Sequence, residues 1–74
     1  MHIHEAIAKI LEIENQSLSY AETLERKVQL GTLLQLLNTI NTVVYQEVMD
    51  ELAKENPNPN ILKTINDAFT LDNK

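Results

Sequence analysis

Two histidines near the N-terminus are the side chains that most resemble metal ligands. His2 and His4 flank a single residue in MHIHE. Residues two apart on a helix point about 200° away from each other, so both imidazoles could bind one ion only from an extended or frayed terminus. No cluster of Asp and Glu nearby completes a coordination set. We therefore expect a solvated start to the first helix, and no metal or other cofactor.

Four acidic residues are the other group whose spacing could do chemistry: Glu47, Asp50, Glu51 and Glu55. Carboxylates act as a general acid and base when a pocket shifts their pKa values. Helical spacing instead places most of these four on the flank or outer face of a helix. Glu47 and Glu51 border its apolar stripe, where charged residues rim an interface and help to select the partner.

Sequence motifs for catalysis are missing from the chain. It contains no G-x-S-x-G, no phosphate-binding glycine loop and no EF-hand spacing. A helical chain of 74 residues also has little room for a concave pocket that would hold a small molecule. We therefore expect a protein that is not an enzyme and has no small-molecule substrate.

The charge balance disfavours nucleic acids and membranes as partners. Eleven acidic and six basic residues give a net charge of −5, which repels phosphate backbones and anionic lipid surfaces. The longest apolar stretch, 33–45, is interrupted by polar residues and is too short to span a bilayer. The chain has no cysteine, and its N-terminus lacks the pattern of a signal peptide. These features predict a cytoplasmic location.

The scarcity of helix-breaking residues predicts long helices. Only one glycine and two prolines interrupt the sequence, and the first clear stop is ENPNPN at 55–60. Pro57 cannot continue a helix. Asn is a favoured N-cap residue and Pro is favoured at the first position of a helix. Asn58 and Pro59 therefore predict a short C-terminal helix over 59–70.

An apolar stripe predicts a second helix over 32–55. At 100° per residue, seven large residues fall within about 60° of Leu37 and form a stripe of eight with it. The stripe contains Leu30, Leu33, Leu34, Leu37, Ile40, Val44, Val48 and Leu52. Tyr45 lies at its margin and Asn41 lies inside it. An amide in that position either bonds a nearby backbone group or water, or pairs with its own copy across a two-fold axis. The second interpretation predicts that Asn41→Leu raises thermal stability.

The first half of the chain allows two helix breaks. Gly31 can end one helix while Thr32 to Gln35 cap the next, although an unbroken helix through Gly31 costs only about 1 kcal/mol. Upstream, apolar spacing fits one helix over 3–29. The poor helix formers at 15–19 and the capping-box pattern S-Y-A-E, which begins at Ser19, instead favour two helices, about 3–14 and 19–29.

Residues 51–65, ELAKENPNPNILKTI, resemble the turn of type III secretion needle subunits. Both have a helix ending in Leu-Ala-Lys, an Asn/Pro turn and a Leu-containing helix. The resemblance covers about a fifth of the chain. Pro57 and Pro59 are two apart where those subunits space them three apart, and the second helix is shorter here. The resemblance implies a small helical secretion-system component or chaperone as one alternative.

The expected fold is all-α: a small helical hairpin or three-to-four-helix bundle, with a short C-terminal helix after an Asn/Pro turn, in one domain over 1–74. A chain this short buries only roughly 60% of its unfolded surface, and it has neither a disulfide nor a zinc cluster to stabilise it. Self-association is the remaining way to gain stability. We expect a protein–protein interaction module that pairs with a second copy, as a homodimer, or with another helical protein. The predicted interface residues are Leu30, Leu33, Leu34, Leu37, Ile40, Asn41, Val44, Tyr45, Val48 and Leu52. The alternative is a small acidic inhibitor, phage-type or antitoxin-like, that docks on a basic partner.

Overall fold

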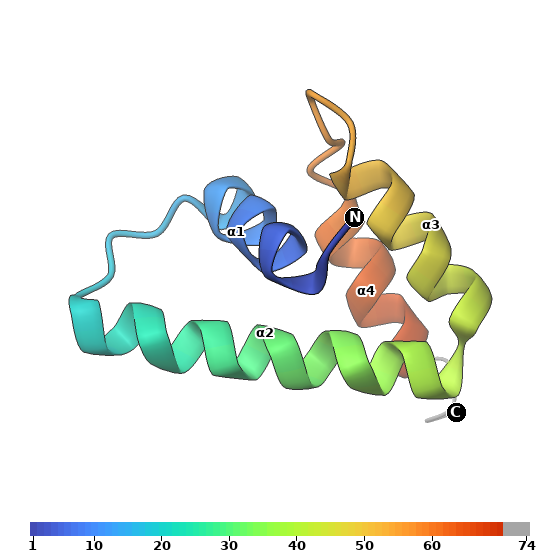
Figure 1. Cartoon of the computed structure of the whole chain (residues 1–74), viewed down its shortest axis with the longest axis horizontal. Helices are drawn as coiled ribbons and strands as arrows, with labels where there is room; N and C mark the ends of the chain where they lie inside the picture. The colour runs from blue at the N-terminus through green and yellow to red at the C-terminus, as the bar shows by residue number, and fades with distance from the viewer. Residues whose placement is uncertain (71–74) are drawn as a thin grey trace.

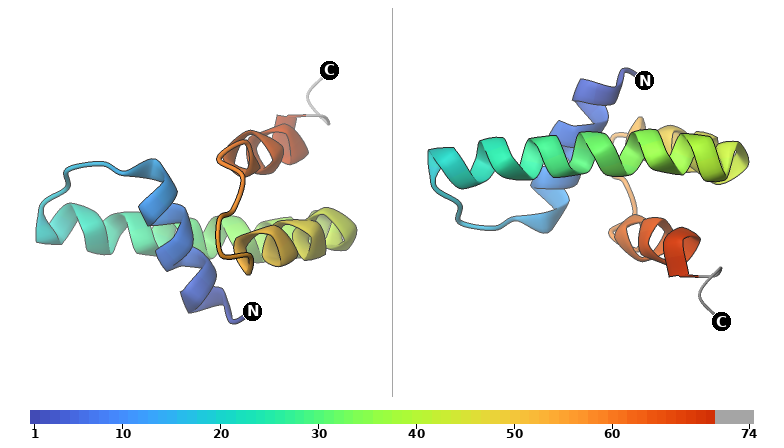
Figure 2. Two further views of the ribbon diagram at one scale, coloured as in Figure 1. Left: turned by 90° about the horizontal axis from the view of Figure 1, so that it is seen from above. Right: turned by 90° about the horizontal axis from the view of Figure 1, so that it is seen from below.

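A computed structural model of the chain describes residues 1–70, which form four α-helices and no strand (Figure 1). The helices are α1 (Ile3–Glu14), α2 (Tyr20–Ile40), α3 (Thr42–Leu52) and α4 (Ile61–Thr70). α1 crosses over the middle of the long helix α2, α3 turns back from the end of α2 at a steep angle to it, and α4 packs against both α2 and α3 (Figures 1 and 2). The predicted small all-α bundle is confirmed. Residues 71–74 of the predicted domain lie outside the described residues.

The first helix break lies at 15–19, one of the two predicted places. Asn15 ends α1 in the left-handed conformation, with φ 46°, which Asn tolerates better than most residues. Ser19 then begins α2 with the predicted capping box. Its hydroxyl accepts from the Glu22 backbone N–H at 3.2 Å, and the Glu22 carboxylate accepts from the Ser19 N–H at 3.0 Å. A single helix over 3–29 does not form.

The second predicted break, at Gly31, does not occur, because α2 runs through this residue without interruption. A Cβ added at Gly31 would lie 3.7 Å from Cδ1 of Ile7 on α1, which is ordinary van der Waals contact. Thr32 and Gln35 are exposed residues inside α2 and do not cap a helix.

The predicted helix over 32–55 is instead two helices that meet at Asn41. This residue has the non-helical angles φ −155° and ψ 84°. Its N–H donates to the carbonyl of Leu37 at 2.8 Å and closes α2. Its side-chain oxygen accepts from the N–H of Val44 at 3.2 Å and caps α3. One residue therefore ends one helix and begins the next, and α3 ends at Leu52 rather than at residue 55.

The composition of this segment explains the break. Residues 38–44 read NTINTVV, a run of Asn, Thr and β-branched residues with low helix propensity. The hydroxyl of Thr42 donates to the carbonyl of Asn38 at 2.9 Å and satisfies a group that a continuing helix would have used. The apolar spacing thus continues on both sides of residue 41, but the residues before it belong to α2 and those after it belong to α3.

The Asn/Pro turn is held by Glu51 on α3. One of its carboxylate oxygens accepts from the backbone N–H of Asn58 at 3.0 Å, and the other accepts from Nζ of Lys54 at 3.1 Å. The Asn58 side chain accepts from the N–H of Asn60 at 3.0 Å. The helix predicted to begin at Pro59 begins two residues later, at Ile61, because residues 59 and 60 form a turn.

The hydrophobic core lies where the four helices meet. It is built of aliphatic and methionine side chains from all four: Ala6, Ile7, Ile10, Leu30, Leu34, Leu37, Val48, Met49, Leu52, Ile61 and Ile65. Phe69 and Tyr45 pack at its edge. Within residues 1–70 no helix combines the length and the apolar character needed to cross a bilayer.

Candidate interaction surface

The structure separates the ten predicted interface residues into three groups. Half of them are core residues of the single chain: Leu30, Leu34, Leu37, Val48 and Leu52. Leu33, Val44 and Tyr45 are partly buried against that core. Ile40 and Asn41 are exposed. The reversal at Asn41 turns both halves of the stripe inward, so the stripe forms no continuous surface for a partner in this conformation.

Asn41 is therefore not a buried amide on an apolar face. It is exposed at the corner between α2 and α3, and its side chain bonds the backbone N–H of Val44. This geometry matches the interpretation of an amide that bonds a nearby backbone group.

A surface without charge lies on the outside of α2 and the start of α3. Every residue from Val28 to Gln46 is uncharged, in a chain of which 23% is charged. A solvated helix normally carries charge on its outer face. Depletion of charged residues is instead the compositional mark of an interface core.

Large apolar side chains are exposed within this uncharged segment. The exposed fractions are 70% for Val28, 50% for Leu36, 49% for Ile40 and 69% for Val43. Thr32 and Thr39 are exposed between them. We call the set Val28, Thr32, Leu36, Thr39, Ile40 and Val43 the neutral face. In the right-hand view of Figure 2, α2 crosses the front of the molecule with the other helices behind it.

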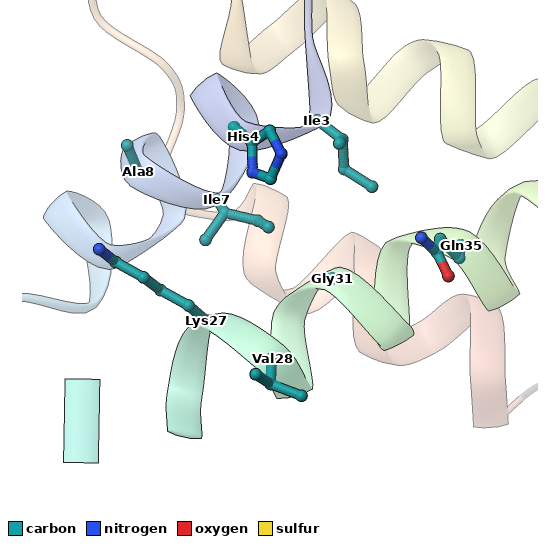
Figure 3. Close-up of a pocket in the computed structure, with 8 residues that line it drawn as sticks. All are labelled: Ile3, His4, Ile7, Ala8, Lys27, Val28, Gly31 and Gln35. Carbon is teal, nitrogen blue, oxygen red and sulfur yellow. The ribbon is translucent and has the colours of Figure 1, made fainter. Parts of the chain in front are cut away.

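A groove opens beside the neutral face, between α1 and α2 (Figure 3). Its volume is about 500 Å³, and its walls are Ile3, His4, Ile7 and Ala8 from α1 with Lys27, Val28, Gly31 and Gln35 from α2. The expectation that so small a chain lacks room for a concave site is thus wrong, since ligand pockets start at about 300 Å³. Gly31 contributes by lacking a side chain at the floor.

The histidines lie where the sequence placed them, at the start of α1. Nδ1 of His2 accepts from the backbone N–H of His4 at 3.2 Å and caps the helix, and the two rings stack with centroids 5.0 Å apart. Across residues 1–70, no three side chains of the metal-ligating types Cys, His, Asp and Glu gather into a candidate metal site.

The four acidic residues in and after α3 are either exposed to solvent or hydrogen-bonded to the turn that follows the helix. Glu47 and Asp50 are exposed, and so is Glu55 in the turn that follows. Hydrogen bonds from the Asn58 N–H and then from Lys54 lower the pKa of Glu51 below its ordinary value. A carboxyl group held ionised by a turn that it stabilises has a structural role.

Comparison of the chain with known protein families, with curated proteins and with solved structures gives no match. The candidate surface therefore depends on the geometry alone.

Sequence reasoning missed the neutral face, although one signal for it is present in the sequence. The run of nineteen uncharged residues from Val28 to Gln46 is visible without a structure. What cannot be read from it is which residues point outward, because that depends on the reversal at Asn41. The groove had no sequence signal, since it depends on where α1 crosses α2.

Proposed function

We propose that this protein is a non-enzymatic interaction module that pairs with a second copy of itself through the neutral face. The observation that carries the proposal is that exposed large apolar residues lie within the uncharged run from Val28 to Gln46, which covers the second half of α2 and the start of α3. Contiguous exposed apolar surface on a small body is typical of a contact surface.

The absence of charge favours a second copy over a different protein. In a two-fold contact each residue near the axis meets the same surface of the other chain, so a charge there would face its own kind. A different partner could match each charge with an opposite one and would not require depletion. Two chains of net charge −5 repel each other over most of their surface, and the neutral face is where that repulsion is weakest.

The dimensions of the molecule allow such a contact. A standard interface takes about 800 Å² from each partner, which is about 15% of the 5217 Å² surface of this chain. With 21 residues, α2 is about 31 Å long, close to the 35 Å length of the whole molecule. Two copies of α2 crossing face to face would place Leu36 and Ile40 within the contact.

Sedimentation equilibrium at micromolar concentrations tests the proposal. The unaltered chain should behave as a dimer, and Leu36→Glu should behave as a monomer with unchanged helical circular dichroism. Thr64→Glu is the matched control, because it adds the same charge at an exposed position of α4 and should leave the dimer intact. A chain that stays strictly monomeric and folds cooperatively would refute the proposal.

Salt dependence separates this function from the alternative of an acidic inhibitor, which the net charge of −5 favours. An apolar contact should hold or tighten as ionic strength rises, whereas docking through carboxylates on a basic partner should weaken steeply. The charge also supports the proposals that the protein binds no nucleic acid directly and no anionic membrane. A cytoplasmic location and a role as a small secretion-system component or chaperone stay predictions.

A further inference from the structure

The groove between α1 and α2 differs in charge from the rest of the molecule. The chain has almost twice as many acidic as basic residues, yet the groove is lined by one lysine and one histidine and by no carboxylate. The remaining walls are mainly apolar, with Ile3 and Ile7 on one side and Val28 on the other. This combination is complementary to a molecule with an anionic head and an apolar body.

Lys27 has no partner of its own among residues 1–70. The ion pairs in that range join Arg26 to Glu14 and Lys54 to Glu51. The side chain of Lys27 extends along one end of the groove, below Ala8, while Gln35 and Ile3 lie at the other end (Figure 3). A charged head at Lys27 would leave the body of the ligand to run over Ile7.

The length of the groove sets the size of the ligand. Lys27 and Gln35 are eight residues apart on α2, so they are separated by about 12 Å along the helix axis. Gly31 lies between them and leaves the floor open. A single ammonium group suits a singly charged head better than a phosphate, which attracts several donors.

We propose that this groove binds an aliphatic carboxylate of medium chain length. The carboxylate pairs with Lys27 and its tail covers Ile7 and the Gly31 floor toward Ile3. The imidazole of His4 lies above Ile7 on the α1 wall of the groove (Figure 3). This site is separate from the dimer contact except at Val28, which borders both.

Calorimetric titration of the full chain with decanoate, below its micelle concentration, tests the site. Decanoate should bind one molecule per chain, and decanol, which has the same tail without the charge, should bind about tenfold more weakly. Lys27→Gln should weaken decanoate about tenfold and leave decanol unchanged, whereas Lys63→Gln, an exposed lysine of α4, should change neither. Gly31→Leu fills the floor and should abolish binding of both probes.

The same titration on Leu36→Glu separates this site from the proposed function. Decanoate should bind that variant as it binds the unaltered chain, whether or not the chain dimerises, because Leu36 does not line the groove. The proposal is overturned if decanoate does not bind, if decanol binds equally well, or if Lys27→Gln leaves decanoate affinity unchanged.

Discussion

Arg26 on α2 donates hydrogen bonds to both carboxylate oxygens of Glu14, the last residue of α1. Nε of Arg26 lies 3.1 Å from Oε1 of Glu14, and its terminal nitrogen pairs with Oε2. This hydrogen bonding raises the pKa of Arg26 above its ordinary value. The pair closes the 15–19 loop by fixing the end of α1 against α2.

Replacing Arg26 by Met should lower the free energy of unfolding by about 1 to 2 kcal/mol, because it leaves the partly buried Glu14 carboxylate without its two donors. Urea unfolding followed by circular dichroism measures the loss. Lys27→Met is the control at the next position, where no ion pair forms within residues 1–70, and it should change stability by less than about 0.5 kcal/mol. Equal effects of the two substitutions would mean that the Arg26–Glu14 pair contributes nothing measurable.

Replacing Asn41 by Leu should destabilise the protein by about 1 kcal/mol, because it removes the side-chain cap of α3. This sign is opposite to the one expected for an amide buried in an apolar stripe. Asn41→Ser, which keeps a capping oxygen, should retain most of the stability, and Asn38→Ala, one turn earlier and exposed, should be nearly neutral. Thermal melts of the three variants check this, and a rise in Tm for Asn41→Leu would contradict the cap.

Replacing Gly31 by Ala should stabilise the protein by about 0.5 to 1 kcal/mol, since alanine is the better helix former in a helix interior. The new methyl group would meet Ile7 at an ordinary contact distance. Denaturant unfolding measures the change. A loss of stability would show that α1 cannot accept even a methyl group at the crossing.

The hydrogen bonds to Glu51 make stability depend on pH on the acid side. The pKa of Glu51 is lowered in the folded chain relative to the ordinary value of 4.5. Its contribution is therefore fully present above the unfolded pKa and is lost as pH falls through the folded pKa. Tm should decline below about pH 4.5, and Glu51→Gln should flatten part of that decline. An identical acid profile for Glu51→Gln would exclude this carboxyl group as a cause. Asp50→Asn, an exposed neighbour, is the control.

The sequence was sufficient to predict features set by neighbouring residues, such as caps and turns. It was not sufficient to predict features that depend on the direction in which the chain continues after a turn. The capping box at Ser19 and the Asn/Pro turn that contains Pro57 could be predicted, because each is decided by neighbouring residues, although α3 ends earlier than expected, at Leu52. Gly31 looked like a break but stays helical, since packing of α2 outweighs the small cost of one glycine. At Asn41 the spacing of apolar residues continues, but α2 ends and a new helix begins. The helical periodicity was extended across Asn41 as if one helix ran through it. Leu34 and Leu37, which are core residues, were therefore predicted to lie on an interface.

The absence of charge between Val28 and Gln46 also matters when the protein unfolds. Residues 40–45 read INTVVY, a segment of high β-propensity that contains neither charge nor proline. Six-residue segments of this composition carry the sequence signature of cross-β stacking and are an aggregation hazard when they are exposed in an unfolded chain. In the native state the caps at Asn41 hold this segment in helical or corner geometry. The residue that turns the chain between α2 and α3 therefore also keeps this segment out of the extended conformation that cross-β stacking requires.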